Sequence, residues 1–280
     1  MDTQTAFDRK YNYKPDGPQE YSPNEITNKT ISFGELHQLA SNHFIPSGIE
    51  GIDKGIGGFP LGKVVVIAGE QHIGKTKLIT KISLHIATDN PLLYYSCGYD
   101  LNLLYNGFMK ELSTKTTEQS KQSRFLKRGG IKSKKIEKRV EDFKLFFNNS
   151  YYPSIETFKK DCEKEITDKG IKVVVINYFE NLGHEKNGLT KGQIDEHVMK
   201  ALGKIARELF VSIIVISELK NYFGIDDSCL FPLIKTIPGS GTIDQNADTI
   251  LFMVENGNGE KELVVGKGDE DKLGLRCKIH

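Results

Sequence analysis

The sequence predicts an α/β fold, in which a mostly parallel sheet carries helices on both faces and ends in antiparallel hairpin strands. Short apolar runs rich in Val and Ile alternate with segments whose apolar residues recur at helical spacing, and this alternation is typical of parallel sheets. The first run leads through a glycine-rich loop into a helix. The last three runs follow one another with no helix between them, which predicts antiparallel strands at one edge.

Five short runs give the core strands. Each is apolar at nearly every position, as expected for strands that are buried on both faces of a parallel sheet. They span residues 64–68, 92–96, 145–147, 173–177 and 213–217. The closing strands span residues 249–254, 262–265 and 275–279. A Gly257-Asn258-Gly259 turn predicts that the first two closing strands form a hairpin.

Four segments between these strands have the apolar spacing of helices. They cover the residues that follow the glycine loop as far as 87, then 101–112, 154–167 and 193–209. Ser154 can cap the third helix, because its hydroxyl oxygen can accept a hydrogen bond from a backbone N–H of the first turn. Glycines and prolines between residues 45 and 63 predict tight turns ahead of the first core strand, and residues 219–247 predict a long loop.

The stretch from Gly69 to Thr76 fits the phosphate-binding motif G-x-x-x-x-G-K-[ST] and stands between a strand and a helix, as that motif requires. Its glycines let backbone N–H groups surround phosphate oxygens, and the helix start adds free N–H donors. Lys75 is expected to reach the β- and γ-phosphates, and Thr76 to bind Mg²⁺. The predicted cofactors are therefore ATP and Mg²⁺. The predicted cofactor-binding positions are Gly69, Gln71, His72, Ile73, Gly74, Lys75, Thr76 and Lys77. The alternative is a chance match in an ordinary turn, and the strand–loop–helix context argues against it.

The composition narrows the class of protein. The net charge is +1, so charge alone predicts no partner. The four cysteines are scattered without a C-x-x-C pair, which is typical of reduced thiols in a cytosolic protein. The seven histidines form no cluster with metal-ligand spacing, and no apolar run is long enough to span a membrane. Because the N-terminus has no signal-peptide core, we expect a cytoplasmic protein without a membrane partner.

The chain divides into three parts. Residues 1–30 are polar with three prolines, which predicts a mobile arm whose three tyrosines can dock on a partner. Residues 31–45 predict a short linker helix that packs on its own core or on a neighbouring subunit, and the sequence leaves both open. Residues 46–280 are expected to form one nucleotide-binding domain.

The segment 115–139 is strongly basic, with ten Lys or Arg residues against two Glu residues. Such a segment can be a solvated surface, or it can contact the phosphate backbone of a nucleic acid. Only one aromatic residue, Phe125, interrupts the charges, so base stacking receives little support from the sequence. Both interpretations stay open on charge alone.

Five stretches carry a resemblance to a known family. They are IPSGIEGIDKGIGGFPLGKVVVIAGEQHIGKT, VVVINYFENL, ALGKIARELFVSIIVISELKN, GSGTIDQNADTILFM and KELVVGKGDEDKLGLRCKI. In this order they resemble the C-terminal, RecA-like motor domain of DnaB-type replicative helicases, from about residue 45 to the C-terminus. The resemblance implies a RecA-like P-loop NTPase fold with ATP between subunits. It also implies a homo-oligomer, such as a hexameric ring, or a subunit of a replication assembly. Single-stranded DNA is the implied partner of the segment 115–139 and the loop 219–247.

The resemblance assigns the metal site and reveals a departure there. Thr76 matches the family's Mg²⁺-binding hydroxyl. Asn177 stands where the family has an aspartate that holds Mg²⁺ and its water, so Thr76 and Asn177 are the predicted metal ligands. A neutral amide supports a cation less than a carboxylate does.

The catalytic positions depart further. Gly98 stands where the family has the glutamate that polarises the attacking water, and Asp100 can substitute from two residues away. Glu218 replaces the usual glutamine after a strand. Asp269 stands near the position of the family's trans-acting arginine finger, where it would repel the γ-phosphate, and Lys267 is left to supply positive charge. The candidate catalytic residues are Lys75, Glu218, Asp100 and Lys267.

Three functional hypotheses follow. The first is an ATP-binding helicase relative with weak or lost hydrolysis that acts on or near single-stranded DNA. The second is a working ATP-dependent DNA helicase whose carboxylates, Asp100 and Glu218, have been rearranged. The third is a RecA-like recombinase or filament protein, and it is weaker because the IPSGIEGID and GSGTIDQNAD stretches look helicase-like.

Overall fold

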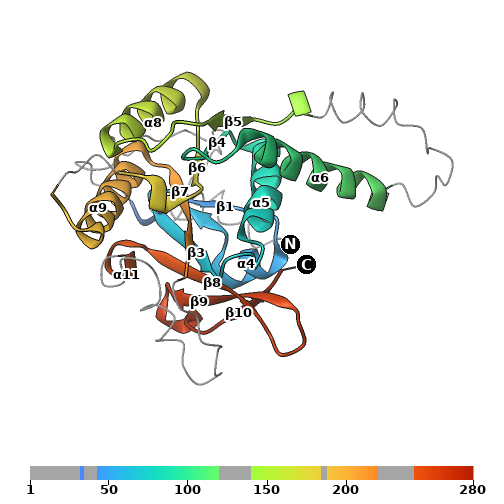
Figure 1. Cartoon of the computed structure of the whole chain (residues 1–280). Helices are drawn as coiled ribbons and strands as arrows, with labels where there is room; N and C mark the ends of the chain where they lie inside the picture. Colours follow the sequence, from blue (N-terminus) through green and yellow to red (C-terminus); the bar gives the residue numbers. More distant parts are fainter. Residues whose placement is uncertain (1–31, 35–42, 120–139, 184–187, 220–242, 280) are drawn as a thin grey trace.

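The computed structural model describes residues 32–34, 43–119, 140–183, 188–219 and 243–279 (Figure 1). Its centre is an eight-stranded sheet in the order β10-β9-β8-β3-β7-β6-β4-β5. All neighbours from β8 to β5 pair in parallel, whereas β9 and β10 join antiparallel at the other edge. The strands are β3 (Val64–Gly69), β4 (Leu92–Tyr95), β5 (Leu145–Asn148), β6 (Val173–Ile176), β7 (Ser212–Glu218), β8 (Thr249–Glu255), β9 (Lys261–Lys267) and β10 (Arg276–Lys278). The predicted α/β fold class is confirmed.

Strand β3 is the buried centre of this sheet. It lies between β7 and β8, and all of its residues are buried. Its β-branched side chains alternate between the two faces, as the pleat of a strand requires. Val64, Val66 and Ala68 face one hydrophobic core, and Val65 and Ile67 face the other.

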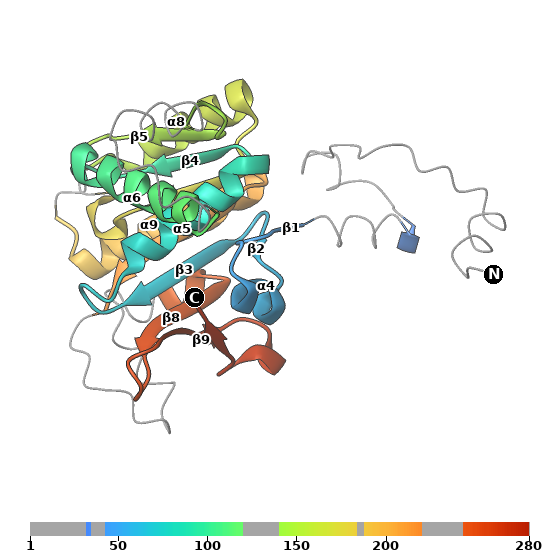
Figure 2. The ribbon, with the colours of Figure 1, turned by 90° about the vertical axis from the view of Figure 1, so that its right-hand side faces the viewer.

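Helices cover both faces of the sheet (Figures 1 and 2). On one face lie α8 (Ile155–Lys169) and α9 (Lys191–Leu209), whose apolar residues share a core with Val64 and Val66. On the other lie α5 (Lys75–Asp89) and α6 (Leu101–Gln119), which contact each other. Helix α6 continues beyond the predicted end at residue 112. None of the helices in the described ranges is long and apolar enough to cross a membrane.

Local capping groups set the starts of α8 and α9. The Ser154 hydroxyl accepts the Thr157 backbone N–H at 3.0 Å, as predicted for the start of α8. At α9 the Thr190 hydroxyl and the Gln193 side chain form a reciprocal capping box. Because Thr190 is the cap, α9 starts two residues before the predicted boundary.

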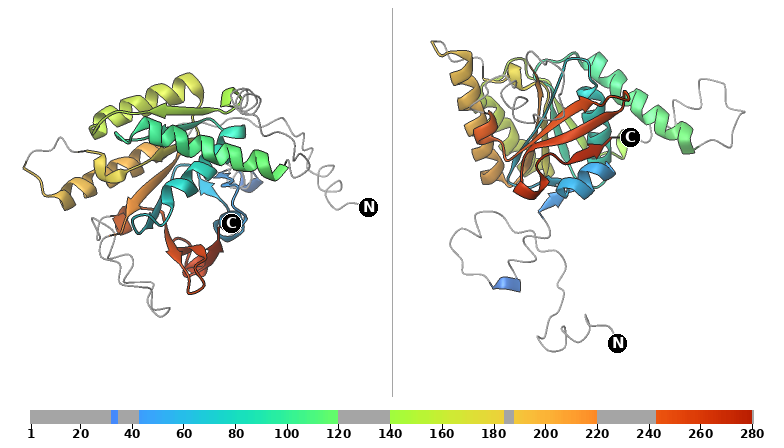
Figure 3. Two further views of the ribbon diagram at one scale, coloured as in Figure 1. Left: turned by 45° about the vertical axis from the view of Figure 1, so that its right-hand side comes forward. Right: turned by 90° about the horizontal axis from the view of Figure 1, so that it is seen from below.

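The entry to β3 differs from the prediction of turns alone. Residues Glu50–Ile56 form helix α4, which contacts β10 (Figure 3). The helix buries Ile52 and Ile56 and ends at Gly57 in the left-handed conformation. Ahead of it, Phe44–Ile45 form strand β1, which pairs antiparallel with β2 (Phe59–Pro60). The predicted linker helix 31–45 therefore does not extend to its last two residues.

Three short helices complete the described part. They are η1 (Phe179–Asn181), α11 (Ile243–Asn246) within the predicted loop 219–247, and η2 (Glu270–Lys272). The arm 1–30, most of 31–42, the basic residues 120–139 and the loop residues 220–242 lie outside the described residues. The predictions on those segments therefore stay predictions.

Candidate functional site

The glycine loop runs from the carboxyl end of β3 to the first turn of α5. Gly69 closes β3, and a side chain there would meet the Met253 carbonyl oxygen at 3.0 Å, so glycine allows β8 to pack closely. Gly74 precedes the helix with a φ of 110°, a conformation that glycine adopts freely. His72 adopts a positive φ of 64° without being glycine. The loop thus has the sharply turned backbone that a phosphate-binding loop needs.

Lys75 begins α5 and lies almost fully buried beneath the loop. Its Nζ donates hydrogen bonds to the carbonyl oxygens of Gly69, at 2.9 Å, and Glu70, at 2.7 Å. Burial lowers the pKa of the Lys75 ammonium, because it removes water from the charged form. Carboxylates oppose this lowering, in decreasing order those of Glu218, Glu180 and Glu70. Lys75 is therefore a cation surrounded by negative charge.

Among these carboxylates, the predicted candidate Glu218 has the strongest electrostatic effect on the pKa of Lys75. It ends β7, and its backbone pairs with Gly69 in the parallel register, which places it beside the loop. Thr76 is half-buried in the first turn of α5, next to Lys75. The structure thus brings together the loop, Thr76 and Glu218 at the carboxyl ends of adjacent strands, where α/β sheets bind ligands.

Glu180 was not predicted and lies at the same edge. The short helix η1 turns the chain after β6, and the Glu180 carboxylate accepts hydrogen bonds from the Ser217 hydroxyl at 2.9 Å and the Glu218 backbone N–H at 3.1 Å. Its charge also contributes, after burial, to raising the pKa of the Cys97 thiol at the end of β4 to about 12. Glu180 therefore lies among the ends of β4, β7 and the glycine loop. A carboxylate four residues after the end of a buried strand was the signal in the sequence that could have identified it.

Asn177 is fully buried directly after β6. Its side-chain Nδ2 donates to the Tyr94 hydroxyl at 2.9 Å, while its Oδ1 has no hydrogen-bond partner within the described residues. Burying an unpaired acceptor oxygen costs about 1–3 kcal/mol, so this oxygen is a site where a donor or a cation's water would be favoured. The Tyr94 hydroxyl was not predicted as the amide's partner.

The predicted substitute Asp100 has another role. It precedes α6, and its Oδ1 accepts the backbone N–H groups of Asn102 at 2.7 Å and Leu103 at 3.1 Å. Asp100 is thus an exposed cap of α6. Gly98 has a φ of 82°, and a Cβ built on it would lie 2.9 Å from the Tyr151 ring. A tyrosine ring therefore lies against the position where the resemblance leads one to expect a glutamate.

The remaining candidates lie at the other end of the sheet. Lys267 ends β9 opposite Ile250, and its Nζ donates to the carbonyl oxygen of Asp244 in α11. Asp269 binds Lys272 at 2.6 Å. Neither residue is brought to the glycine loop of its own chain.

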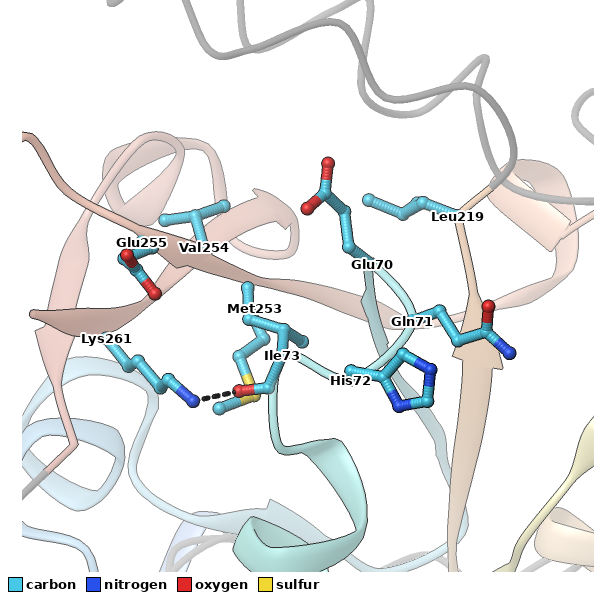
Figure 4. A pocket seen from close by; sticks show the side chains of 9 residues that line it. All are labelled: Glu70, Gln71, His72, Ile73, Leu219, Met253, Val254, Glu255 and Lys261. Carbon is cyan, nitrogen blue, oxygen red and sulfur yellow. Dashed lines mark hydrogen bonds between the residues drawn. The ribbon is translucent and has the colours of Figure 1, made fainter. Parts of the chain in front are cut away.

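A cavity of about 320 Å³ lies on the side of the loop that faces β8 and β9 (Figure 4). Its lining residues are Glu70, Gln71, His72, Ile73, Leu219, Met253, Val254, Glu255 and Lys261. Lys261 was not predicted. Its Nζ donates to the Ile73 carbonyl oxygen at 2.5 Å and so ties the loop to the hairpin. Gln71 and His72 are exposed here, as is Lys77 on the first turn of α5. The volume falls in the range of small-molecule sites.

Comparison with known proteins identifies the family. Residues 45–272 match the model of the DnaB-like helicase C terminal domain. The chain is 24% identical over 240 residues to a probable plasmid replicative DNA helicase of Chlamydia psittaci, covering 82% of this chain and 52% of that protein. It is 24% identical over 228 residues to the replicative DNA helicase DnaC of Bacillus subtilis (strain 168), covering 78% and 48%. The chain therefore spans about half the length of these relatives.

Solved structures agree on the fold. A DnaB-like replicative helicase, described with its interactions with primase, superposes with a TM-score of 0.70 at 17% identity, covering 88% of this chain and 64% of that chain. A solved ATPase domain superposes with a TM-score of 0.72 at 17% identity, covering 90% of this chain and all of that one. Both support the predicted RecA-like architecture. With the family model matching most of its length, the chain belongs to the DnaB-like helicase C-terminal domain family.

Proposed function

We propose that this chain binds ATP with Mg²⁺ at the glycine loop, hydrolyses it slowly, and acts on or near single-stranded DNA as part of a homo-oligomer or replication assembly. The observation that carries the proposal is the strand–loop–helix unit, with Lys75 buried at the start of α5. Membership of the helicase family supports the partner classes.

The chain's own groups can hold a triphosphate. The start of α5 presents backbone N–H groups and the positive end of a 15-residue helix to the loop. Lys75 donates to two backbone carbonyl oxygens, and it would exchange these for phosphate oxygens. Phosphate oxygens are stronger partners, because their negative charge attracts the ammonium more strongly than a neutral carbonyl oxygen does. Binding therefore needs little rearrangement beyond one lysine side chain.

The residues present fit Mg²⁺ as a companion of the nucleotide. Thr76 supplies a hydroxyl beside Lys75, Glu218 supplies a carboxylate, and the Asn177 Oδ1 is an unpartnered buried oxygen. Such a cation would neutralise charge on the phosphates. No group of three acidic, His or Cys side chains in the described ranges could hold a metal by itself, so phosphate oxygens must complete the shell, as is usual for Mg²⁺.

Hydrolysis requires more than binding. A water must be polarised and the transferring phosphoryl group must meet positive charge. Gly98 has no side chain for the first task, and Asp100 is engaged as a helix cap. Asp269, paired with Lys272, cannot act as a positive group. Losing an arginine finger alone costs about 10³–10⁵ in rate in related NTPases, so slow turnover is expected.

An active helicase is the second candidate function. The position of Glu218 beside the glycine loop favours it, because a carboxylate there would be available to polarise water. A wild-type turnover of about 1 s⁻¹ or more, with or without single-stranded DNA, would place this candidate first.

The test of binding is calorimetry with ATP and Mg²⁺. Lys75→Ala is expected to abolish binding, because it removes the only cation buried beneath the loop in the described residues. Lys200→Ala is the matched control, since this exposed lysine lies on α9 and pairs with Glu196 one turn away on the same helix. Equal ATP affinity in wild type and Lys75→Ala would refute the proposal.

The test of nucleic-acid binding is fluorescence anisotropy with a single-stranded oligonucleotide across a salt series. Contacts to phosphates release counterions, so affinity is expected to fall steeply as salt rises. The basic segment 115–139 motivates this expectation. If the oligonucleotide does not bind at low salt, the nucleic-acid part of the proposal is removed and ATP binding is untouched.

A further inference from the structure

The glycine loop lies in an unusually acidic setting. The Lys75 ammonium stands against the carboxylates of Glu218, Glu180 and Glu70, which all act on its charge. A bound triphosphate would bring further negative charge to the same place. At close range, like charges in a partly buried site repel strongly, because the effective dielectric constant there is well below that of water. A divalent cation bound close to the carboxylates would offset this repulsion.

Glu180 is fixed in its position by two hydrogen bonds. The Ser217 hydroxyl, which is fully buried, and the Glu218 backbone N–H both donate to its Oε1, at 2.9 Å and 3.1 Å. Both donors come from the last two residues of β7, whose backbone pairs with the end of β3. The carboxylate is thus held half-buried beside the start of the loop. A flexible surface glutamate would not be held in this way.

An independent observation at the same edge indicates a ligand. Asn177, three residues before Glu180, is fully buried, and its Oδ1 has no partner within the described residues. The amide nitrogen is already used by the Tyr94 hydroxyl, which fixes the side chain. A water molecule bound to a cation would donate to such an oxygen. Position 177 is therefore suited to accept from a cation's water shell, while it lacks the negative charge to attract the cation.

We propose that Glu180 supplies the negative charge that position 177 lacks, and that it holds the nucleotide-bound Mg²⁺ directly or through one water, with Asn177 accepting from the same water shell. This inference rests on the proposed binding of ATP and Mg²⁺. The carboxylate has moved three residues along the chain, and the turn of η1 brings it back to the end of β7. Glu180 is thus a cation-positioning residue of this chain.

The experiment measures ATP affinity by calorimetry with excess EDTA and with saturating Mg²⁺, in wild type, Glu180→Gln and Glu163→Gln. Glu163 lies exposed on α8 and pairs with Lys159, so its variant removes one negative charge elsewhere. In Mg²⁺, Glu180→Gln is expected to bind ATP about 10- to 100-fold more weakly than wild type, the usual loss when a metal's supporting partner is removed. In EDTA it is expected to bind ATP at least as tightly as wild type, because a repulsive charge is gone. Glu163→Gln is expected to match wild type in both conditions.

The two conditions separate holding a cation from mere repulsion. If Glu180 only repels the phosphates, Glu180→Gln will bind ATP equally or more tightly in Mg²⁺, and that outcome overturns the proposal. If wild type binds ATP in EDTA with no gain from Mg²⁺, the metal role is overturned while nucleotide binding stands. If wild type binds no ATP in either condition, both the proposed function and this inference fail.

A second, milder variant distinguishes loss of cation binding from loss of folding. Ser217→Ala keeps the carboxylate and removes the hydrogen bond that the Ser217 hydroxyl donates to it, with little change in volume. Its affinity for ATP in Mg²⁺ is expected to lie between those of wild type and Glu180→Gln, with the EDTA value unchanged. Electron paramagnetic resonance with Mn²⁺ and ATP gives a readout other than hydrolysis: free Mn²⁺ is expected to rise in both variants. Unchanged Mn²⁺ and ATP affinity in both would overturn the inference.

Discussion

Replacing Gly98 by alanine tests how firmly the chain excludes a side chain where its relatives are expected to carry a catalytic glutamate. The backbone there has a φ of 82°, and forcing a side chain into this left-handed region costs about 1–2 kcal/mol. The new Cβ would lie 2.9 Å from the Tyr151 ring, which is 72% exposed and can move aside at little cost. Gly98→Ala is therefore expected to lower the free energy of unfolding by about 1–2 kcal/mol, nearly all of it from the backbone.

The chain offers a matched control in Gly107. This glycine lies within α6, has ordinary helical backbone, and a Cβ there would meet nothing within 4 Å. Gly107→Ala is expected to stabilise the protein by about 0.5–1 kcal/mol, since alanine is the better helix former. Urea unfolding of both variants and of Gly98→Ala combined with Tyr151→Ala measures the difference. The reasoning is refuted if Gly98→Ala is as stable as Gly107→Ala, or if removing the Tyr151 ring restores most of the loss.

The backbone strain at position 98 also affects an attempt to restore catalysis. Asn177→Asp together with Gly98→Glu is expected to raise ATP turnover, because it returns the metal-holding and water-polarising carboxylates. The increase in ATP turnover can be measured only under conditions in which the double variant stays folded despite the backbone strain at residue 98. Turnover should therefore be compared at low temperature with that of Asn177→Asp alone, and no gain at full folding would count against the role assigned to position 98.

Three further predictions concern chemistry, stability and turnover. Burial raises the pKa of the Cys97 thiol to about 12, so the thiol stays protonated in the folded protein and ionises more readily in the unfolded chain. The stability that this protonation difference contributes is fully present below pH 9, and it is lost at about 1.4 kcal/mol per pH unit as the pH rises toward 12. Urea midpoints across that range should fall less in Cys97→Ala, and equal slopes would contradict this. Ser154→Ala should destabilise by about 1 kcal/mol through loss of the α8 cap, and an unchanged midpoint would show that the cap is replaced. Single-turnover experiments should show ATP bound and slowly cleaved, and a burst faster than about 1 s⁻¹ would contradict impaired hydrolysis.

The strands of the sheet could be predicted to within a few residues because each is a short apolar run buried on both faces. Helix α4 could not, and its two glycines explain why. A Cβ at Gly51 would lie 2.6 Å from the Lys278 carbonyl oxygen, and one at Gly55 would lie 2.7 Å from the Cys277 sulfur. The glycines are required by close packing against β10, whereas in isolation they weaken a helix. The stabilisation of α4 is tertiary and has no local signal.

The candidate site also contains residues that the sequence predicts and residues that it does not. The loop from Gly69 to Thr76 could be predicted because its motif is contiguous in the sequence. Glu180 was missed because its position depends on η1 returning the chain to Ser217, a contact 37 residues apart. The cap that Asp100 forms could not be foreseen, because its proximity in sequence to Gly98 does not reveal that its carboxylate accepts hydrogen bonds from the backbone of α6. A carboxylate close behind a buried strand can be marked as a candidate from the sequence, but its contacts in the folded chain decide its role.

The hydrogen bond from Lys261 to the Ile73 carbonyl oxygen has a consequence for how the protein is made. It joins residues 188 positions apart, and the strand on one side of β3 also comes from that late part of the chain. At about 5–20 residues per second, the ribosome needs about 10–40 s to reach Lys261 after it has added Ile73. During this time the glycine loop of the nascent chain lacks its hydrogen bond from Lys261. Nucleotide capture is therefore expected only after the β8–β9 hairpin has left the ribosome.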